Sequence, residues 1–231
     1  MTSYRALERY DSVAVFGDLN ENVTRNRITS VLRGVENLLK YEWEQEVKGV
    51  KTERMKIAEL RAPEFSRAYP SQLKLLLVGS NKEVELMNNE VKNFKPLNVS
   101  IFKLNGSKDT NGNVKRCVDF ALAHEESVAM ITFPKEAMKA EQDLRAYLRS
   151  FNDASGVLGE PTGSETSPFG IFGHDEKLGA TRRIIATVLI AFNKLELWLR
   201  YAHPNAFNYI QNKSTGIKNN AYGAKEKHVY D

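Results

Sequence analysis

Apolar residues in the first third of the chain recur at two spacings, one typical of helices and the other of strands. Between Asn26 and Lys48 they return every three or four residues and share one face of a predicted amphipathic helix: Ile28, Val31, Leu32, Val35, Leu38, Leu39 and Trp43. Gln72–Val78 is almost wholly apolar and lies between Pro70 and Gly79, which predicts a strand. A shorter strand is expected over Ser12–Phe16, before a turn at Gly17-Asp18.

The middle of the chain has a pattern typical of an antiparallel sheet. Apolar and polar residues alternate from Asn98 to Leu104, and they alternate loosely from Val114 to Leu122. Between these two stretches lie Asn105-Gly106 and Asn111-Gly112, residue types that tolerate positive φ in tight turns. The pattern therefore predicts a β-hairpin, and a further strand is expected over Ser127–Phe133.

Helices are expected to dominate the second half. Pro134 suits a first helical turn, and the residues that follow predict a helix over Lys135–Phe151. The stretch Gly156–Gly173 contains five glycines and two prolines, which indicates a long loop. Apolar spacing then predicts a long helix over Leu178–Tyr201 that ends before Pro204.

These elements favour an α+β fold in which an antiparallel β-sheet or sandwich core is flanked by long helices. With 42% hydrophobic residues the chain can bury a core. Residues 1–25 are interpreted as an N-terminal arm, because the short charged helix expected over Ser3–Asp11 buries little by itself. Residues 26–231 are then one domain.

Charge and cysteine content narrow the classes of protein. The chain has 33 Lys and Arg against 29 Asp and Glu, with the two signs mixed along it, which favours a solvated surface over a nucleic-acid-binding stretch. A single cysteine, Cys117, excludes an internal disulfide framework and is expected to be buried or inert. The N-terminal residues lack the apolar stretch of a signal peptide, and no run approaches the roughly 18 apolar residues of a membrane span.

Patterns that carry catalytic chemistry are weak. His124-Glu125-Glu126 is the nearest to an acid–base cluster, but successive side chains of a strand or turn point apart. The histidines at 124, 174, 203 and 228 show no ligand spacing with each other or with the cysteine, so no metal site is predicted. The loop at residues 159–166 resembles a phosphate loop but lacks its lysine. These observations together predict a protein that is not an enzyme.

The C-terminal third contains the most extended motif. Leu195-Glu196-Leu197 is followed by Tyr201, then by Pro204-Asn205-Ala206-Phe207 and Tyr209-Ile210, and Tyr222-Gly223 comes near the end. Over about sixteen consecutive positions this motif resembles the C-terminal segment of cypovirus polyhedrin, the matrix protein of viral occlusion bodies. A weaker similarity lies at residues 120–125. Residues 1–60 show no such similarity, and residues 134–173 correspond to an insertion.

The resemblance implies a structural viral protein that forms trimers and self-assembles into crystals in the cytoplasm of the host cell. Such polyhedra embed and protect virions until the alkaline insect gut dissolves them. The partners implied are other copies of the chain and virus particles, with no membrane and no specific nucleic acid. No cofactor is required, although a nucleotide can be held in the lattice at residues that remain unassigned.

The residues expected to act in assembly all come from this motif: Tyr201, Pro204, Asn205, Phe207, Tyr209 and Tyr222. Pro204 stops the helix, Asn205 makes the turn, and the aromatic rings either pack back on the helix or reach a partner. A purely intramolecular cap is the alternative.

Two other classes of function stay open. One is a viral nucleocapsid or RNA-binding coat protein, and the other is a small enzyme whose site the sequence does not reveal. Salt-sensitive RNA binding would favour the coat protein, whereas intracellular crystals formed on expression alone would favour the occlusion-body protein.

Overall fold

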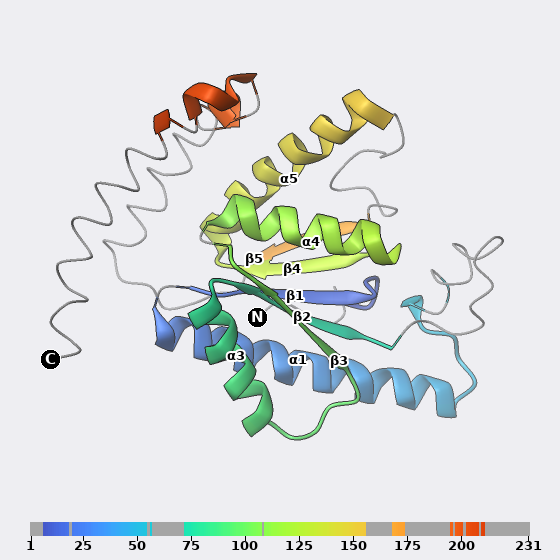
Figure 1. The fold of residues 1–231 in the computed structure, drawn as a ribbon. Coiled ribbons are helices and arrows are strands. Elements are labelled where there is room, and N and C mark those ends of the chain that lie inside the picture. Colours follow the sequence, from blue (N-terminus) through green and yellow to red (C-terminus); the bar gives the residue numbers. More distant parts are fainter. Residues whose placement is uncertain are drawn as a thin grey trace, which may run out of the picture.

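The computed structural model describes most of the chain between residues 7 and 173 and a short stretch near the C-terminus. The described residues are 7–18, 20–54, 56, 72–107, 109–155, 168–173, 195, 197–200, 202–207 and 209–210. Strands and helices alternate in the order β1 (Ser12–Phe16), α1 (Glu21–Val47), β2 (Lys74–Gly79), α3 (Asn81–Asn93), β3 (Ser100–Asn105), α4 (Thr110–His124), β4 (Val128–Thr132), α5 (Pro134–Ser155) and β5 (Phe169–Gly173). Figure 1 shows a single sheet between two layers of helices.

The five strands of this sheet are all parallel and lie in the spatial order β3-β2-β1-β4-β5. Each connection contains a helix, as parallel neighbours require. The chain adds β2 and β3 on one side of β1 and then β4 and β5 on the other. The fold is therefore α/β with a doubly wound sheet. The predicted α+β fold with an antiparallel β-sheet or sandwich core is wrong.

The error arises from the stretch expected to form the second strand of the hairpin. Val114–Leu122 belongs to α4, and its most buried residues have helical spacing: Val114, Cys117, Val118 and Ala121. Asn111-Gly112, which indicates a turn, lies in the first turn of this helix. The carboxylate of Asp109 caps that turn by accepting a hydrogen bond from the Gly112 amide at 2.6 Å. A helix between β3 and β4 turns the expected hairpin into a parallel crossover.

Most other predicted elements are confirmed. The amphipathic helix corresponds to α1, the helix after Pro134 to α5, and the four remaining predicted strands to β1, β2, β3 and β4. The expected loop at Gly156–Gly173 ends in a strand, since its last five residues form β5. Most of the predicted helix at Leu178–Tyr201 lies outside the described residues.

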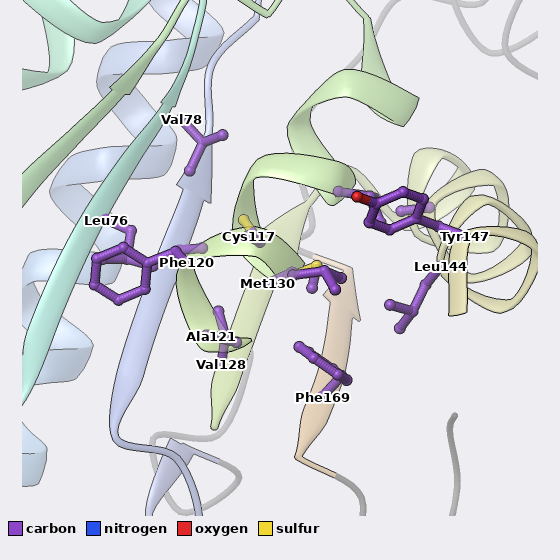
Figure 2. Close-up of a cluster of buried hydrophobic side chains, with 14 of the residues drawn as sticks. Leu76, Val78, Cys117, Phe120, Ala121, Val128, Met130, Leu144, Tyr147 and Phe169 are labelled. Carbon is purple, nitrogen blue, oxygen red and sulfur yellow. The ribbon is translucent and has the colours of Figure 1, made fainter. Parts of the chain in front are cut away.

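β1 is the central strand, and all five of its residues are buried. β1 falls within residues 1–25, the stretch that the sequence predicts to be an N-terminal arm. Because side chains alternate across a sheet, Val13 and Val15 face α1 and α3, whereas Ala14 and Phe16 face α4 and α5. Figure 2 shows the second of these layers, where side chains from the strands meet Cys117 and Phe120 of α4 and Leu144 and Tyr147 of α5.

A buried polar cluster ties three strands together at the amino edge of the sheet, where the strands begin. The carboxylate of Glu126, which precedes β4, pairs with the ammonium group of Lys74 on β2 and accepts a hydrogen bond from the Ser12 hydroxyl at 3.1 Å. The Lys74 nitrogen also lies 5.7 Å from the ring centroid of Phe102 on β3. Since a buried charge is costly unless it is paired, these contacts specify how the central strands are aligned.

Candidate functional site

The carboxyl edge of the sheet is the first place to look for a functional site. Ligands of doubly wound sheets bind outside the carboxyl ends of the strands, at the point where the strand order reverses. Here that point lies between β1 and β4. The connection from β1 to α1 and the connection from β4 to α5 therefore flank it.

The connection after β1 is held by its own hydrogen bonds. The Asp18 amide donates to the Thr24 hydroxyl at 2.8 Å, and this hydroxyl donates back to the Asp18 carbonyl at 2.8 Å. The Asp18 carboxylate accepts from the Asn20 amide at 2.7 Å. The fully buried Arg27 of α1 donates to the Phe16 carbonyl at the end of β1. These contacts fix where the strand ends and the helix begins.

The connections after β1 and β4 contact each other through buried side chains. Val23 in the first turn of α1 packs against Phe133 after β4, and they are 9% and 6% exposed. The Thr132 hydroxyl at the end of β4 donates to the carboxylate of Glu136 at 3.1 Å. At the point where a dinucleotide would lie in other doubly wound proteins, an apolar contact joins the two connections.

On the other side of β1, two glycines allow a carboxylate to approach the backbone closely. A Cβ atom at Gly17 would lie 2.5 Å from the Cβ of Glu83, and one at Gly79 would lie 2.6 Å from its carboxylate. Glu83 receives a hydrogen bond from the Ser80 amide at 2.8 Å and completes a capping box at the start of α3. Its role is therefore to begin a helix.

The N-terminus of α4 contacts the C-terminal segment, which we define as the described residues between 195 and 210. The guanidinium group of Arg200 donates to the Asn111 side chain at 2.7 Å and to the Asp109 carboxylate at 3.4 Å. The Cζ atom of Arg200 lies 4.5 Å from the ring centroid of Phe207. Arg200 thus joins the helical residues before Pro204 to the helical stretch that contains Phe207. Figure 1 shows this segment, in red, on the side of the sheet that α4 and α5 cover.

The structure places four of the six predicted assembly residues. Helical residues flank His203 on both sides, so the helix is interrupted before Pro204. The turn expected at Asn205 is not found, because Pro204 begins a new helical stretch that includes Asn205 and Phe207. Phe207 is half-buried against Arg200, whereas Tyr209 is 62% exposed. Tyr201 and Tyr222 lie outside the described residues. Sequence reasoning missed Arg200, because nothing in its surroundings indicates which distant carboxylate or amide it will meet.

Other candidate chemical groups have structural roles. His124 caps the end of α4, with its Nδ1 atom 2.9 Å from the Phe120 carbonyl and its ring stacked on the Phe120 ring. Cys117 is fully buried, as expected, and burial raises the pKa of its thiol. Among the residues that the structure describes, no three His, Cys, Asp or Glu side chains gather as a metal site would need. Within the same residues, no helix has the length and apolar character to cross a bilayer.

Comparison with known proteins finds no relative: the chain matches no family model, no curated protein and no solved structure.

Proposed function

We propose that this chain is a structural protein that associates with copies of itself, as the matrix protein of an intracellular occlusion body. The observation that carries the proposal is the exposure of four large apolar side chains in the C-terminal segment. Leu195, Trp198, Tyr209 and Ile210 are 54%, 53%, 62% and 51% exposed. Isolated exposed apolar residues are ordinary, but a concentration of them in one short segment is typical of an interaction surface.

The identity of these side chains favours a protein partner. Trp and Tyr are enriched in interfaces because each ring buries a large apolar area and keeps one polar group for a hydrogen bond. The partner proposed is another copy of the chain, because the same segment carries the similarity to cypovirus polyhedrin. The parallel sheet differs from the fold expected with that similarity, so the proposal rests on this segment and not on a shared fold.

The anchoring of the segment also supports the proposal. A surface that is already ordered before it binds loses less conformational entropy on association. Arg200 holds the segment against Asp109 and Asn111 and packs on Phe207. Repeated contacts in a regular assembly need this kind of defined orientation.

Sedimentation velocity of the purified full-length protein over a wide concentration range tests the proposal. The wild type is expected to form trimers and larger species, and Trp198→Ser with Ile210→Ser is expected to shift the protein toward monomer. Ile101→Ser on β3 is the matched control, because Ile101 is also exposed, at 43%, but lies outside the segment. A wild type that stays monomeric, or a control that loses association equally, would contradict the proposal.

A second arm of the experiment separates self-association from RNA binding. Fluorescence anisotropy with single-stranded RNA at increasing salt measures the alternative function, a nucleocapsid or coat protein. We expect at most weak binding, because the net charge is only +4 and the charges of both signs are mixed. Tight, salt-sensitive binding by a monomeric protein would favour the coat protein instead.

A further inference from the structure

β3 forms one edge of the sheet, and the backbone groups on its outer side pair with no strand among the described residues. β3 is the last strand in the order β3-β2-β1-β4-β5, and Figure 1 shows it at the edge of the sheet. The Ser100 amide donates to the Leu73 carbonyl at 3.2 Å, so the backbone of Ser100 points toward β2. Because this direction alternates along a strand, the N–H and C=O groups of Ile101 and Lys103 point away from β2. An edge of this kind is a template for another strand.

The side chains of β3 leave this edge accessible. Ile101 and Lys103 are exposed, whereas Phe102 points to the opposite face, where its ring centroid lies 5.1 Å from that of Phe120 on α4. A lysine on an edge strand can keep a second strand away by its charge. Here the ammonium group of Lys103 pairs with the carboxylate of Glu85 on α3 at 3.4 Å. The charge is therefore directed toward a helix on one face of the sheet and is partly balanced there.

The sequence of β3 favours one register with a second copy of itself. A two-fold axis normal to the sheet pairs two β3 strands antiparallel and keeps every side chain on its own face of the sheet. An axis at Lys103 would place two lysines directly opposite each other, which is destabilising. An axis at Ile101 would place Lys103 opposite Val99, which lies outside β3, and so would shorten the ladder. An axis at Phe102 pairs all of residues 100–104 and places Ile101 opposite Lys103 of the second copy.

We infer that β3 pairs antiparallel with β3 of a second copy about a two-fold axis at Phe102, so that two five-stranded sheets join into one. The exposed backbone groups require a strand as the partner, and the register favours this strand. Ile101 and Lys103 of each copy then exchange backbone hydrogen bonds with Lys103 and Ile101 of the other. The two Phe102 rings form a cross-strand aromatic pair on the face that α4 covers.

This contact is separate from the C-terminal segment and goes beyond the function proposed above. One pair of short strands buries less than the roughly 1,000 Å² of a stable interface, so the dimer is expected to be weak. Because backbone groups make the contact, Ile101→Ser is expected to leave it in place.

Removal of one N–H group at the edge tests the pairing. Lys103→Pro removes an N–H that points away from β2 in the single subunit but donates across the dimer, and edge strands tolerate proline at such positions. Lys103→Ala is the matched control, because it loses the same ion pair with Glu85 but keeps the N–H. Both variants are made in the full-length protein with Trp198→Ser and Ile210→Ser, so that association through the C-terminal segment is read separately.

Sedimentation equilibrium should show dimers of the background protein and of Lys103→Ala. Dimerisation of Lys103→Pro should be about tenfold weaker, because symmetry removes the same hydrogen bond twice. Equal dimerisation of the two variants would overturn the inference, and so would a background protein that stays monomeric at millimolar concentration.

Disulfide cross-linking tests the register at exposed positions, where substitution should leave the fold intact. Ile101→Cys and Lys103→Cys, in the same background, are mixed and oxidised. Their Cα atoms should lie about 5.5 Å apart across the axis, within reach of a disulfide. Each variant alone is the control, because its two copies are diagonal neighbours about 7 to 8 Å apart. The native Cys117 is fully buried and should not contribute.

Mass spectrometry of the mixture should find the mixed dimer well above the share expected from random pairing. Mixed and self-linked dimers in random proportion, or no cross-linked dimer at millimolar concentration, would overturn the inference. This result does not depend on whether Lys103→Pro folds.

Discussion

The sheet and the C-terminal segment place similar side chains in opposite environments. Leu75, Leu76 and Leu77 of β2 are at most 1% exposed, because helices cover both faces of the sheet. Leu195 and Trp198 are more than half exposed, although Arg200, in the same turn, is anchored to α4. The comparison indicates that the free energy of folding comes mainly from the sheet, while the segment leaves apolar surface exposed, as the proposed association requires. The two properties should therefore respond separately to substitution.

The largest expected effect is the difference in stability loss between two leucine-to-alanine substitutions. Leu76→Ala should lower the free energy of unfolding by about 3 to 4 kcal/mol, because it leaves a cavity at a fully buried position. Leu195→Ala should change it by less than about 0.5 kcal/mol, because that side chain is 54% exposed. Urea unfolding followed by circular dichroism measures both. Similar losses at the two positions would show that the segment is part of the core.

The next effect concerns the cluster at the amino edge of the sheet. Glu126→Gln should cost about 3 kcal/mol, because it leaves the Lys74 ammonium group largely buried without its counter-charge. Glu53→Gln removes the partner of Lys56 in an exposed ion pair and should cost less than about 0.5 kcal/mol. The same urea titration compares them. A loss below about 1 kcal/mol for Glu126→Gln would mean that Lys74 reaches solvent in the variant.

Alkali should destabilise the fold through a buried thiol. Burial raises the pKa of Cys117 above its ordinary value of 9.0, so above that pH the unfolded chain loses a proton that the folded chain keeps. This contribution to stability is complete below pH 9 and should fall by about 2 kcal/mol by pH 10.5. Cys117→Ala should remove this part of the pH dependence of unfolding measured between pH 8 and 11. Unchanged pH dependence in that variant would exclude the thiol.

Burial also raises the pKa of Tyr10, whose ring packs edge-on against Phe172 of β5. The sign is the same as for Cys117: stability is retained below pH 10 and lost as the pH rises further. Tyr10→Phe should therefore flatten the remaining decline above pH 10 by a smaller amount than Cys117→Ala does. Together, the two groups make the fold less stable in alkali.

The smallest effect tests the anchor of the segment. Arg200→Ala should cost about 1 kcal/mol or less, because its contact with the half-exposed Asp109 is weak and its stacking on Phe207 is partly solvated. Association should nevertheless fall, because the segment loses its fixed orientation. Sedimentation velocity and urea unfolding of the same variant provide both readings. Full association in Arg200→Ala would show that the anchor is not needed.

The sequence predicted most single elements but not how they are connected. The helical spacing of apolar residues from Ile28 to Leu38 predicts α1, and the apolar run between Pro70 and Ser80 predicts β2. Both elements could be predicted because these signals are local in the sequence. Whether strands pair parallel or antiparallel depends on the segment that joins them. Because part of α4 was predicted to be a strand, the predicted sheet was antiparallel. Asp109 as an N-cap and the spacing of Val114, Cys117 and Ala121 were the signals that could have identified this helix.

The candidate site was harder to predict from the sequence than the fold. The helix stop before Pro204 is a local property of proline, so it could be predicted. The contact between Arg200 and Asn111 joins residues 89 positions apart, and no local pattern indicates it. Trp43, predicted to lie on the core face of its helix, is 64% exposed because α1 is longer than the strands, which becomes visible only when the sheet is known.

The most direct test of self-assembly is electron microscopy and X-ray powder diffraction of insect cells that express the chain alone. Micrometre-sized bodies that diffract are expected for the wild type and for the control Ile101→Ser. They should be absent for Trp198→Ser with Ile210→Ser, although that variant should unfold at the same urea concentration as the wild type. A wild type that stays soluble and disperse at high expression would contradict the account, and so would bodies that form equally well without the two apolar side chains.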